Sequence, residues 1–274
     1  MKLPQSAQPG DPREIQPGPS VKLVVAYDGT HFKGWQKGNG RTVQDTLEKA
    51  LINALPRASG GAVPPGSYSV EQLHLVGAGR TDAGVHAEGQ VASAILPIPV
   101  KLDILLSAAN EELPPDVAIK NINPAPDRFH ARYHAKTRTY RYSILLGPSG
   151  DPFRALYAWH IPKELNIDAM RNAAALLEGT QDFTSLTADK SKSNRVRTVH
   201  EIRVELQGQH LELFFTADSF LWNQVRIMTM VLVQTGLGSI GIPEIRSLLQ
   251  ARNRALAPEP APARGLCLFS VSYE

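Results

Sequence analysis

An aspartate set between glycines is the residue of this sequence with the clearest chemical potential. Asp82 lies within residues 79–86, which read GRTDAGVH, and apolar sequence flanks them on both sides. Glycines permit a positive φ or the close approach of a ligand, and packed strands hold a side chain in one orientation. The stretch therefore predicts a turn that presents a carboxylate as a nucleophile or a base. The alternative is that Asp82 only caps its turn, because aspartate is common in turns.

Arg226 is the residue most in need of a partner. The apolar periodicity predicts a largely buried helix over residues 223–235, and Arg226 is the one cation in it. An unpaired buried charge is very costly, so the guanidinium should meet a carboxylate or a phosphate, and Asp82 is the obvious candidate. Such a pair would lower the pKa of Asp82 and keep it ionised. Alternatively, Arg226 extends to the surface at the start of the helix.

A stretch of basic and aromatic residues opens the second half of the chain. Residues 128–150 contain no acid, and their cations Arg128, Arg132, Lys136, Arg138 and Arg141 stand among Phe129, His130, Tyr133, His134, Tyr140 and Tyr142. A second basic cluster consists of Lys190, Lys192, Arg195 and Arg197. Cations mixed with aromatic rings suit a polyanion whose bases can stack, so they favour RNA over duplex DNA. A solvated basic surface is the plainer alternative.

Other chemistries lack the residues that they need. Asp28, at the end of the first predicted strand, resembles a turn residue more than the second carboxylate of a glycosidase. His130 and His134 have the spacing of metal ligands but no third ligand near them, so no metal is expected. Residues 77–79 lack the third glycine of a dinucleotide-binding loop, so no nucleotide cofactor is expected.

Composition narrows the class of protein. The chain has 274 residues, of which 42% are hydrophobic and 20% charged, and a net charge of +3, as is typical of soluble globular proteins. No apolar run reaches the roughly 18 residues needed to span a bilayer. The single cysteine, Cys267, excludes an intramolecular disulfide and favours a reducing compartment. The first twenty residues form a tail rich in proline and glycine without an apolar signal region, so the cytoplasm is the expected location.

Strands and helices alternate along the sequence that must position these residues. Apolar periodicity predicts strands over residues 21–27, 72–77, 89–96, 117–122, 137–146, 202–206, 211–215 and 266–273, and helices over 42–55, 102–110, 168–178, 223–235 and 243–250. Residues 123–126, which read NPAP, are typical of a stiff joint. The sequence therefore predicts an α+β protein with two domains that share or abut one sheet, residues 21–126 with the Asp82 turn and residues 127–274.

Residues 78–86, which read AGRTDAGVH, resemble the signature of the tRNA pseudouridine synthase A family. Four further segments stand in the order of that family, at residues 27–36 (YDGTHFKGWQ), 42–44 (TVQ), 129–142 (FHARYHAKTRTYRY) and 220–226 (FLWNQVR). The closing residues 262–268 (PARGLCL) are also similar. The resemblance extends from about residue 21 to residue 273 and leaves only the leading tail outside it.

The resemblance implies an enzyme that isomerises uridine to pseudouridine in tRNA, around positions 38 to 40 of the anticodon arm, without a cofactor or a metal. It implies two α/β-type halves whose mainly antiparallel strands form one extended sheet flanked by helices, with a catalytic cleft between the halves. A homodimer is implied as well. Trp222 and Asn223 stand where other members often have histidines, and they resemble eukaryotic members. Other tRNA positions, other RNAs and a mitochondrial or nuclear location are therefore the alternatives.

The resemblance also implies roles for single residues. Asp82 would be the catalytic aspartate, as nucleophile or as base, and Arg226 its ion-pair partner. Tyr140 would stack on the target base, which must leave its own stack to react. Arg80 would help to hold the flipped nucleotide, and Leu266 would form an apolar wall. The other residues expected to bind RNA are Arg132, Lys136, Arg138, Gln36 and Gln44. A non-catalytic tRNA-binding protein and a nucleoside hydrolase are the rival interpretations.

Overall fold

The computed structural model describes residues 18–188 and 194–274. Most of the expected tail, residues 1–17, lies outside the described residues, as do Lys190 and Lys192 of the second basic cluster. Strand β1 begins at Ser20, and the carbonyl of Pro19 accepts a hydrogen bond of 3.1 Å from the amide of Leu96. Residues 19 and 20 therefore belong to the folded part of the chain.

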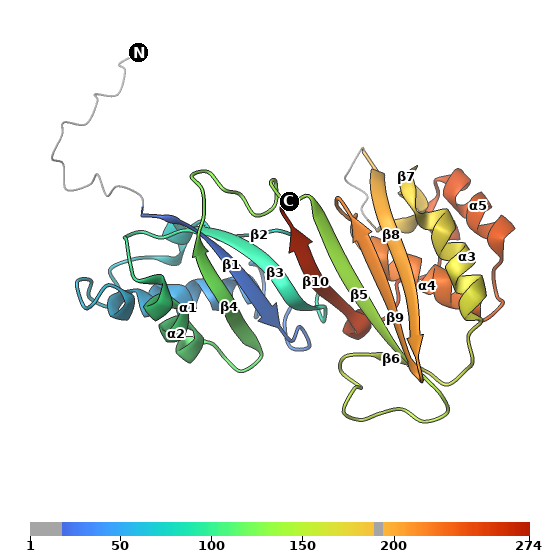
Figure 1. The fold of residues 1–274 in the computed structure, drawn as a ribbon, viewed down its shortest axis with the longest axis horizontal. Coiled ribbons are helices and arrows are strands. Elements are labelled where there is room, and N and C mark those ends of the chain that lie inside the picture. The colour runs from blue at the N-terminus through green and yellow to red at the C-terminus, as the bar shows by residue number, and fades with distance from the viewer. Residues whose placement is uncertain (1–17, 189–193) are drawn as a thin grey trace, which may run out of the picture.

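One sheet runs through both halves of the described chain (Figure 1). Pairing is antiparallel, except that β10 is parallel to β3 and β6 is parallel to β5. The prediction of an α+β protein with mainly antiparallel strands in one extended sheet is confirmed. Across the sheet the order is β4 (Val117–Pro124), β1 (Ser20–Tyr27), β3 (His86–Ile95), β10 (Leu266–Ser272), β5 (Thr137–Leu146), β9 (His210–Ala217), β8 (Val196–Gln207) and β7 (Gly179–Asp182), with β2 (Val76–Gly77) added to β3 and β6 (Trp159–Ile161) added to β5.

Helices flank this sheet in two groups, one at each end (Figure 1). Helices α1 (Val43–Ala58) and α2 (Leu102–Glu112) lie at the N-terminal half, and α3 (Ile167–Leu177), α4 (Gln224–Gly236) and α5 (Ile242–Ala251) lie at the C-terminal half. Buried side chains of the strands and of both helix groups form one continuous apolar core. All five predicted helices are confirmed, because an apolar stripe at helical spacing is a strong local signal. None of the helices in the described ranges is long and apolar enough to cross a membrane.

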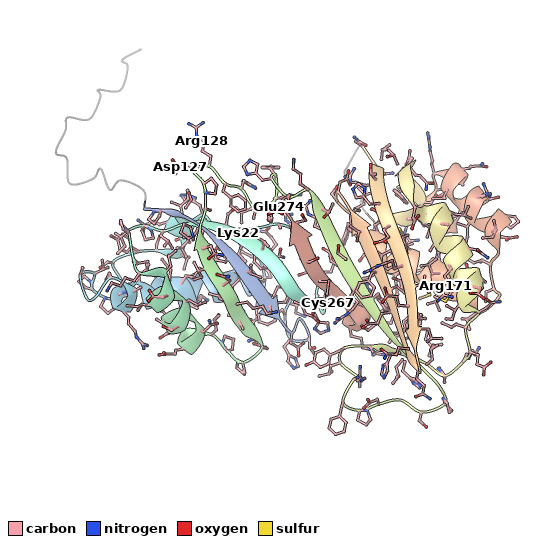
Figure 2. All side chains as sticks on the ribbon, viewed as in Figure 1. Lys22, Asp127, Arg128, Arg171, Cys267 and Glu274 are labelled. Carbon is pink, nitrogen blue, oxygen red and sulfur yellow. The ribbon has the colours of Figure 1, made fainter. Side chains whose placement is uncertain are left out.

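The last strand, β10, lies at the centre of the sheet and joins its two halves. Cys267 of β10 is opposite His86 of β3 in the parallel pair, and Leu266 is opposite Tyr142 of β5 in the antiparallel pair. Cys267 is labelled on this strand in Figure 2, and burial raises the pKa of its thiol to about 12. Because the C-terminal strand is inserted between β3 and β5, the end of the chain meets residues of both halves in the middle of the sheet.

The predicted strand over residues 72–77 is mostly wrong. A 3-10 helix occupies Val70–Leu73, and only Val76 and Gly77 form a strand. The amide of Ser69 donates to the Gln72 side chain at 2.8 Å, which stabilises the helical turn. A Cβ at Gly77 would lie 2.5 Å from the ring of Trp35, so the backbone runs against that ring. The short strands β6 and β7 were not predicted, because segments of three or four residues carry almost no periodicity.

Candidate active site

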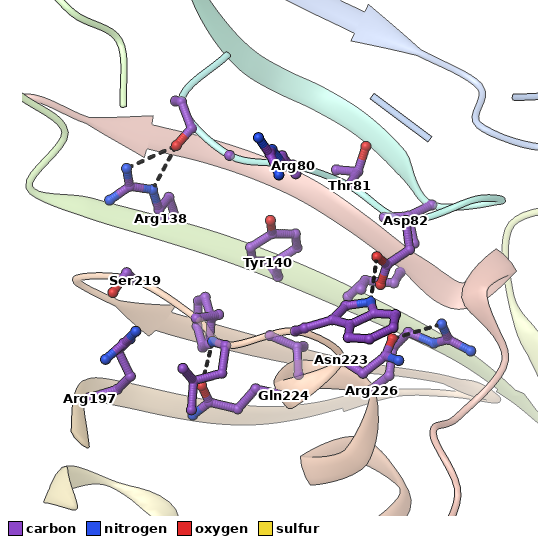
Figure 3. A pocket seen from close by; sticks show the side chains of 18 of the residues that line it. Arg80, Thr81, Asp82, Arg138, Tyr140, Arg197, Ser219, Asn223, Gln224 and Arg226 are labelled. Carbon is purple, nitrogen blue, oxygen red and sulfur yellow. Dashed lines mark hydrogen bonds between the residues drawn. The ribbon is translucent and has the colours of Figure 1, made fainter. Parts of the chain in front are cut away.

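A cavity of about 1230 Å³ is lined by residues from both halves of the chain (Figure 3). Most of its wall comes from the Asp82 turn after β2, from β5 and the loop before it, and from the segment between β9 and α4. Leu266, at the start of β10, completes the wall. Of the predicted site residues, the cavity brings together Arg80, Asp82, Arg132, Arg138, Tyr140, Arg226 and Leu266.

Contacts to the first strand and the loop after it hold the Asp82 turn in place. The buried hydroxyl of Thr81 hydrogen-bonds the hydroxyl of Tyr27 at 2.8 Å, and the carbonyl of Thr81 accepts from the Trp35 amide at 3.0 Å. Gly34 has a φ of +101°, and a Cβ there would lie 2.6 Å from the Thr81 carbonyl oxygen. Glycine is therefore required at this approach, and the turn is supported by packed elements on its inner side.

The Asp82 carboxylate is directed towards the cavity. Its Oδ1 accepts a hydrogen bond of 3.0 Å from Nε1 of Trp222, drawn as a dashed line in Figure 3. Within the described ranges the carboxylate makes no hydrogen bond to its own turn, so the structure does not support the turn-capping alternative. Burial raises the pKa of Asp82, whereas the charge of Arg226 and the Trp222 hydrogen bond act to lower it. A lowered pKa was expected only for an ion pair between Arg226 and Asp82; in this structure burial outweighs both opposing effects.

Arg226 lies in the first turn of α4 and lines the cavity, but its hydrogen bonds go elsewhere. Its Nε donates to the carbonyl of Ala261 at 2.6 Å, and one terminal nitrogen donates to Oδ1 of Asn223 at 3.1 Å. No ion pair with Asp82 within 4.0 Å occurs among the described residues, so the expected direct pair is not formed in this structure. The charge of Arg226 acts on Asp82 from a distance and offsets part of the rise that burial causes in the pKa of Asp82.

Tyr140 and Leu266 supply the aromatic and apolar part of the wall. Tyr140, on β5, is 8% exposed and meets the ring of Phe220 edge to face, with 5.4 Å between the centroids. Burial, helped by the negative charge of Asp82, raises the pKa of Tyr140 well above its usual value, so the phenol stays neutral. Leu266 is 5% exposed and also lines the cavity. A neutral ring and an aliphatic side chain suit the faces of a nucleobase.

Arg138 is buried beneath the cavity and holds backbone segments together. All five N–H groups of its guanidinium donate to main-chain carbonyls, namely those of Ala78, Arg132, Ala135 and Asp218 at 2.5 to 3.5 Å. Figure 3 shows the pair of bonds to Ala78 as dashed lines from the labelled Arg138. Desolvation lowers its pKa from the usual arginine value. Its donors are therefore occupied within the protein, although RNA contact was expected for it.

Three other guanidinium groups line the cavity without a carboxylate partner. Arg80 and Arg132 are exposed, and Arg197 of β8 donates to backbone carbonyls at 2.6 and 3.4 Å. Within the described ranges, none of the three forms an ion pair with an acid. Arg141, from the same basic stretch as Arg132, lies instead on the sheet and pairs with Glu88 at 2.6 Å. The cations of the acid-free stretch therefore differ in their surroundings. Arg132 has no acid partner in the described ranges, Arg141 pairs with Glu88, and Arg138 is buried.

Gln36, Gln44 and Lys136 do not line the cavity. Gln44 is 9% exposed, and its side chain bonds to Glu48, to the carbonyl of Leu75 and to Gln36 at 2.9 to 3.2 Å. This network fixes the loop before α1 against the start of β2. Lys136 is exposed at the start of β5.

The structure also shows the contacts of Asp28, considered as a second carboxylate, and of His130 and His134, considered as metal ligands. Asp28 accepts hydrogen bonds from the amide and hydroxyl of Thr30 at 2.9 and 2.5 Å and from Tyr157 at 2.7 Å, so it stabilises the turn that follows β1. It does not line the cavity. The Nδ1 of His134 accepts a bond of 3.1 Å from the amide of His130, and no group of three potential metal ligands occurs in the described ranges.

The predicted site residues left out three aromatic residues of the cavity, Tyr133, Phe220 and Trp222. Trp222 is 55% exposed and donates to Asp82, whereas Tyr133 is 78% exposed and stacks on His130, with 4.2 Å between the ring centroids. Both stand within segments that carried other signals, because Trp222 precedes the apolar helix and Tyr133 lies in the basic stretch. A large aromatic side chain next to two polar residues, just before a helix, was the available signal for Trp222.

Comparison with known proteins gives a consistent result. The family model described as tRNA pseudouridine synthase matches residues 23–134 and 173–274. The chain is 40% identical to tRNA pseudouridine synthase A of Geobacillus kaustophilus, over 93% of this chain and 94% of the relative. It is 39% identical to tRNA pseudouridine synthase A of Bacillus subtilis, over 93% of this chain and 99% of the relative. It is also 39% identical to the protein of that name from Limosilactobacillus reuteri, over 92% of this chain and 96% of the relative.

Proposed function

The chain belongs to the tRNA pseudouridine synthase family, a family of isomerases, and we propose that Asp82 is the catalytic residue with which it converts uridine in the anticodon arm of tRNA. The observation that carries the proposal is the setting of Asp82. Its carboxylate faces a cavity that also presents Tyr140, Arg226 and Leu266. Asp218, the other acid of the wall, is exposed and accepts a bond from the Ser219 amide beside it.

The chemistry needs an enclosed carboxylate. Conversion of uridine to pseudouridine detaches the base from the sugar, turns it and rejoins it through carbon, so the base must be outside the RNA stack. Burial raises the pKa of Asp82 and makes the carboxylate more basic, which suits a nucleophile or a general base. Tyr140 and Leu266 would hold the faces of the base while it turns.

The cations around the cavity would guide the RNA. Arg80, Arg132 and Arg197 have no acid partner in the described ranges, so their charges are available to phosphates. Tyr133 offers an exposed ring next to Arg132. Its amide and that of Arg132 both donate to Nδ1 of His130 at 3.2 Å, which keeps the loop in place. An unstacked base of the anticodon arm would stack on this ring.

Assembly and location form part of the same proposal. We expect a homodimer in solution, and sedimentation of the purified protein would measure it. The single buried thiol, whose pKa is raised to about 12, is consistent with a reducing compartment such as the cytoplasm.

The test is the Asp82→Asn variant, assayed with tRNA labelled with tritium at C5 of uridine. Asparagine keeps the shape of the side chain and can still accept a bond from Trp222, so folding should be preserved. We expect no tritium release, with tRNA affinity within about threefold of the parent. Asp168→Asn is the matched control, because Asp168 is an exposed acid at the start of α3 and should leave turnover unchanged.

Three results would count against the proposal. Tritium release by Asp82→Asn at the parent rate would remove Asp82 from the chemistry. Free uracil instead of pseudouridine would indicate a nucleoside hydrolase. Tight tRNA binding by the parent without any tritium release would indicate a binding protein. Mapping pseudouridines in RNA from cells that lack the protein would identify the target position.

A further inference from the structure

The indole of Trp222 makes the only hydrogen bond to the Asp82 carboxylate among the described residues. The Nε1–H donates to Oδ1 at 3.0 Å across 140 positions of sequence. Oδ1 is thereby fixed in direction, and the negative charge is partly compensated at one oxygen. No other side chain of the cavity contacts this carboxylate within hydrogen-bonding distance, so its orientation depends on the indole.

The other polar groups near Asp82 cannot replace this bond. Arg226, on α4, uses its Nε on Ala261 and a terminal nitrogen on Asn223. Tyr140, on β5, is a neutral phenol whose hydroxyl makes no bond to Asp82. Arg80 lies two residues before Asp82 and is exposed, and no hydrogen bond or ion pair joins the two side chains within the described ranges. The indole is therefore the direct partner that the sequence suggested Arg226 would be.

The backbone at Trp222 is anchored, although more than half of its side chain is exposed. Its carbonyl accepts bonds of 3.0 Å from the Ala188 amide and from the Thr187 hydroxyl. On the helix side, Asn223 adopts a left-handed conformation with φ of 60°, which turns the chain sharply into α4. An anchored backbone with a ring lying over the cavity is suited to aim one N–H group.

We propose that Trp222 is a positioning residue, whose indole N–H holds the Asp82 carboxylate in its reactive orientation and favours its ionised form. The inference rests on the proposed catalytic role of Asp82. A hydrogen bond to the charged form of an acid stabilises that form. The bond therefore offsets part of the cost of keeping a carboxylate in a sheltered cavity, while leaving its second oxygen available to the substrate.

The pH dependence of turnover separates this role from a structural one. If the ionised form of Asp82 reacts, the rate falls as the pH falls through its pKa. Loss of the bond raises that pKa further, so the fall begins at higher pH. Tyr140 stays neutral between about pH 5 and pH 8, because burial raises the pKa of its phenol. A shift of the acidic limb therefore reports on Asp82.

The experiment compares Trp222→Phe with the parent enzyme, using tritium release from tRNA. Phenylalanine keeps an aromatic ring and removes only the N–H donor. We expect kcat to fall by about tenfold at pH values on the acidic limb and by less at higher pH, as for the loss of one charge-assisted bond. KM for tRNA should change by less than about twofold. Trp222→His, which restores a ring N–H, should recover part of the acidic limb.

Trp159→Phe is the matched control, because Trp159 lies in β6, edge to face with Tyr142 at 6.5 Å, and does not line the cavity. It should reproduce the profile of the parent. A Trp222→Phe profile that coincides with the parent at every pH would refute the positioning role. A Trp222→Phe variant that is faster than the parent at every pH would also refute it, because the indole of the parent would then obstruct the base. These outcomes leave the catalytic role of Asp82 intact, since that role is tested separately by Asp82→Asn.

Discussion

Replacing Arg138 with methionine should destabilise the protein and leave its electrostatic attraction to tRNA unchanged. Methionine fills a similar volume but removes every donor to the carbonyls of Ala78, Arg132 and Asp218, which lie at 2.5 to 2.9 Å from the terminal nitrogens. At about 1 to 1.5 kcal/mol for each of these carbonyls, one buried and two partly buried, that loses its charged donor, the free energy of unfolding should fall by about 3 to 5 kcal/mol. The midpoint of thermal unfolding should fall by roughly 10 °C.

The consequence for RNA binding is specific. Because all five N–H groups of Arg138 are occupied inside the protein, the dependence of log Kd on log salt concentration should keep the slope of the parent. Arg132→Met is the matched control, because Arg132 is an exposed guanidinium on the same cavity. It should change the stability by less than about 0.5 kcal/mol and reduce the salt slope by about one unit.

Urea unfolding followed by circular dichroism, with filter binding of tRNA at four salt concentrations, measures both effects. If Arg138→Met does not fold, Arg138→Lys provides the same test, because one ammonium can reach only some of the carbonyls and should lose part of the stability. The reasoning fails if Arg138→Met unfolds like the parent, or if either Arg138 variant is stable but has a reduced salt slope. Arg138 would then contact phosphate, as the basic and aromatic sequence around it suggested.

Two further predictions concern the hydrogen-bond network of Gln44 and the cation Arg226. Gln44→Ala should lower the free energy of unfolding by about 2 kcal/mol, because it removes the side-chain donor to the Leu75 carbonyl. Gln36→Ala, at an exposed position, should change it by less than about 0.5 kcal/mol. Urea unfolding checks both values, and a stable Gln44→Ala variant with weakened tRNA binding would show that Gln44 contacts RNA instead. Arg226→Met should lower the free energy of unfolding by about 2 kcal/mol, because the hydrogen bond to Ala261 is lost. It should also slow tritium release at least tenfold. An unchanged rate would exclude any action of the Arg226 charge on Asp82.

Local sequence was sufficient for much of the framework. The five helices follow from apolar stripes at helical spacing, and the long strand β5 follows from alternation over ten residues, because both patterns are set by neighbouring positions. The strand expected over residues 72–77 forms only at Val76 and Gly77, because a 3-10 helix occupies Val70–Leu73. Gly77 itself runs against the ring of Trp35, a side chain from another segment. That contact joins residues far apart in the sequence, so no periodicity within the segment could predict it.

The roles of the cations show the same limit. Arg132, Arg138 and Arg141 look alike in sequence, each within two residues of a tyrosine in a stretch without acids. In the fold, one faces the cavity, one donates to buried carbonyls and one pairs with Glu88, an acid supplied by another strand. An acid-free stretch therefore says nothing about which charges remain free, because sheet pairing brings acids from elsewhere.

The sequence by itself determined the family and the carboxylate proposed to react, because the nine residues around Asp82 and their glycines are contiguous and their chemistry is local. Tertiary structure alone decided which groups surround that carboxylate. Insertion of β10 between β3 and β5 brings Leu266 to the cavity, and the turn before α4 places Trp222, not Arg226, on the Asp82 oxygen. The direction of the pKa shift of Asp82 follows from burial, which is a property of all the segments that close the cavity together and of no single stretch of the chain.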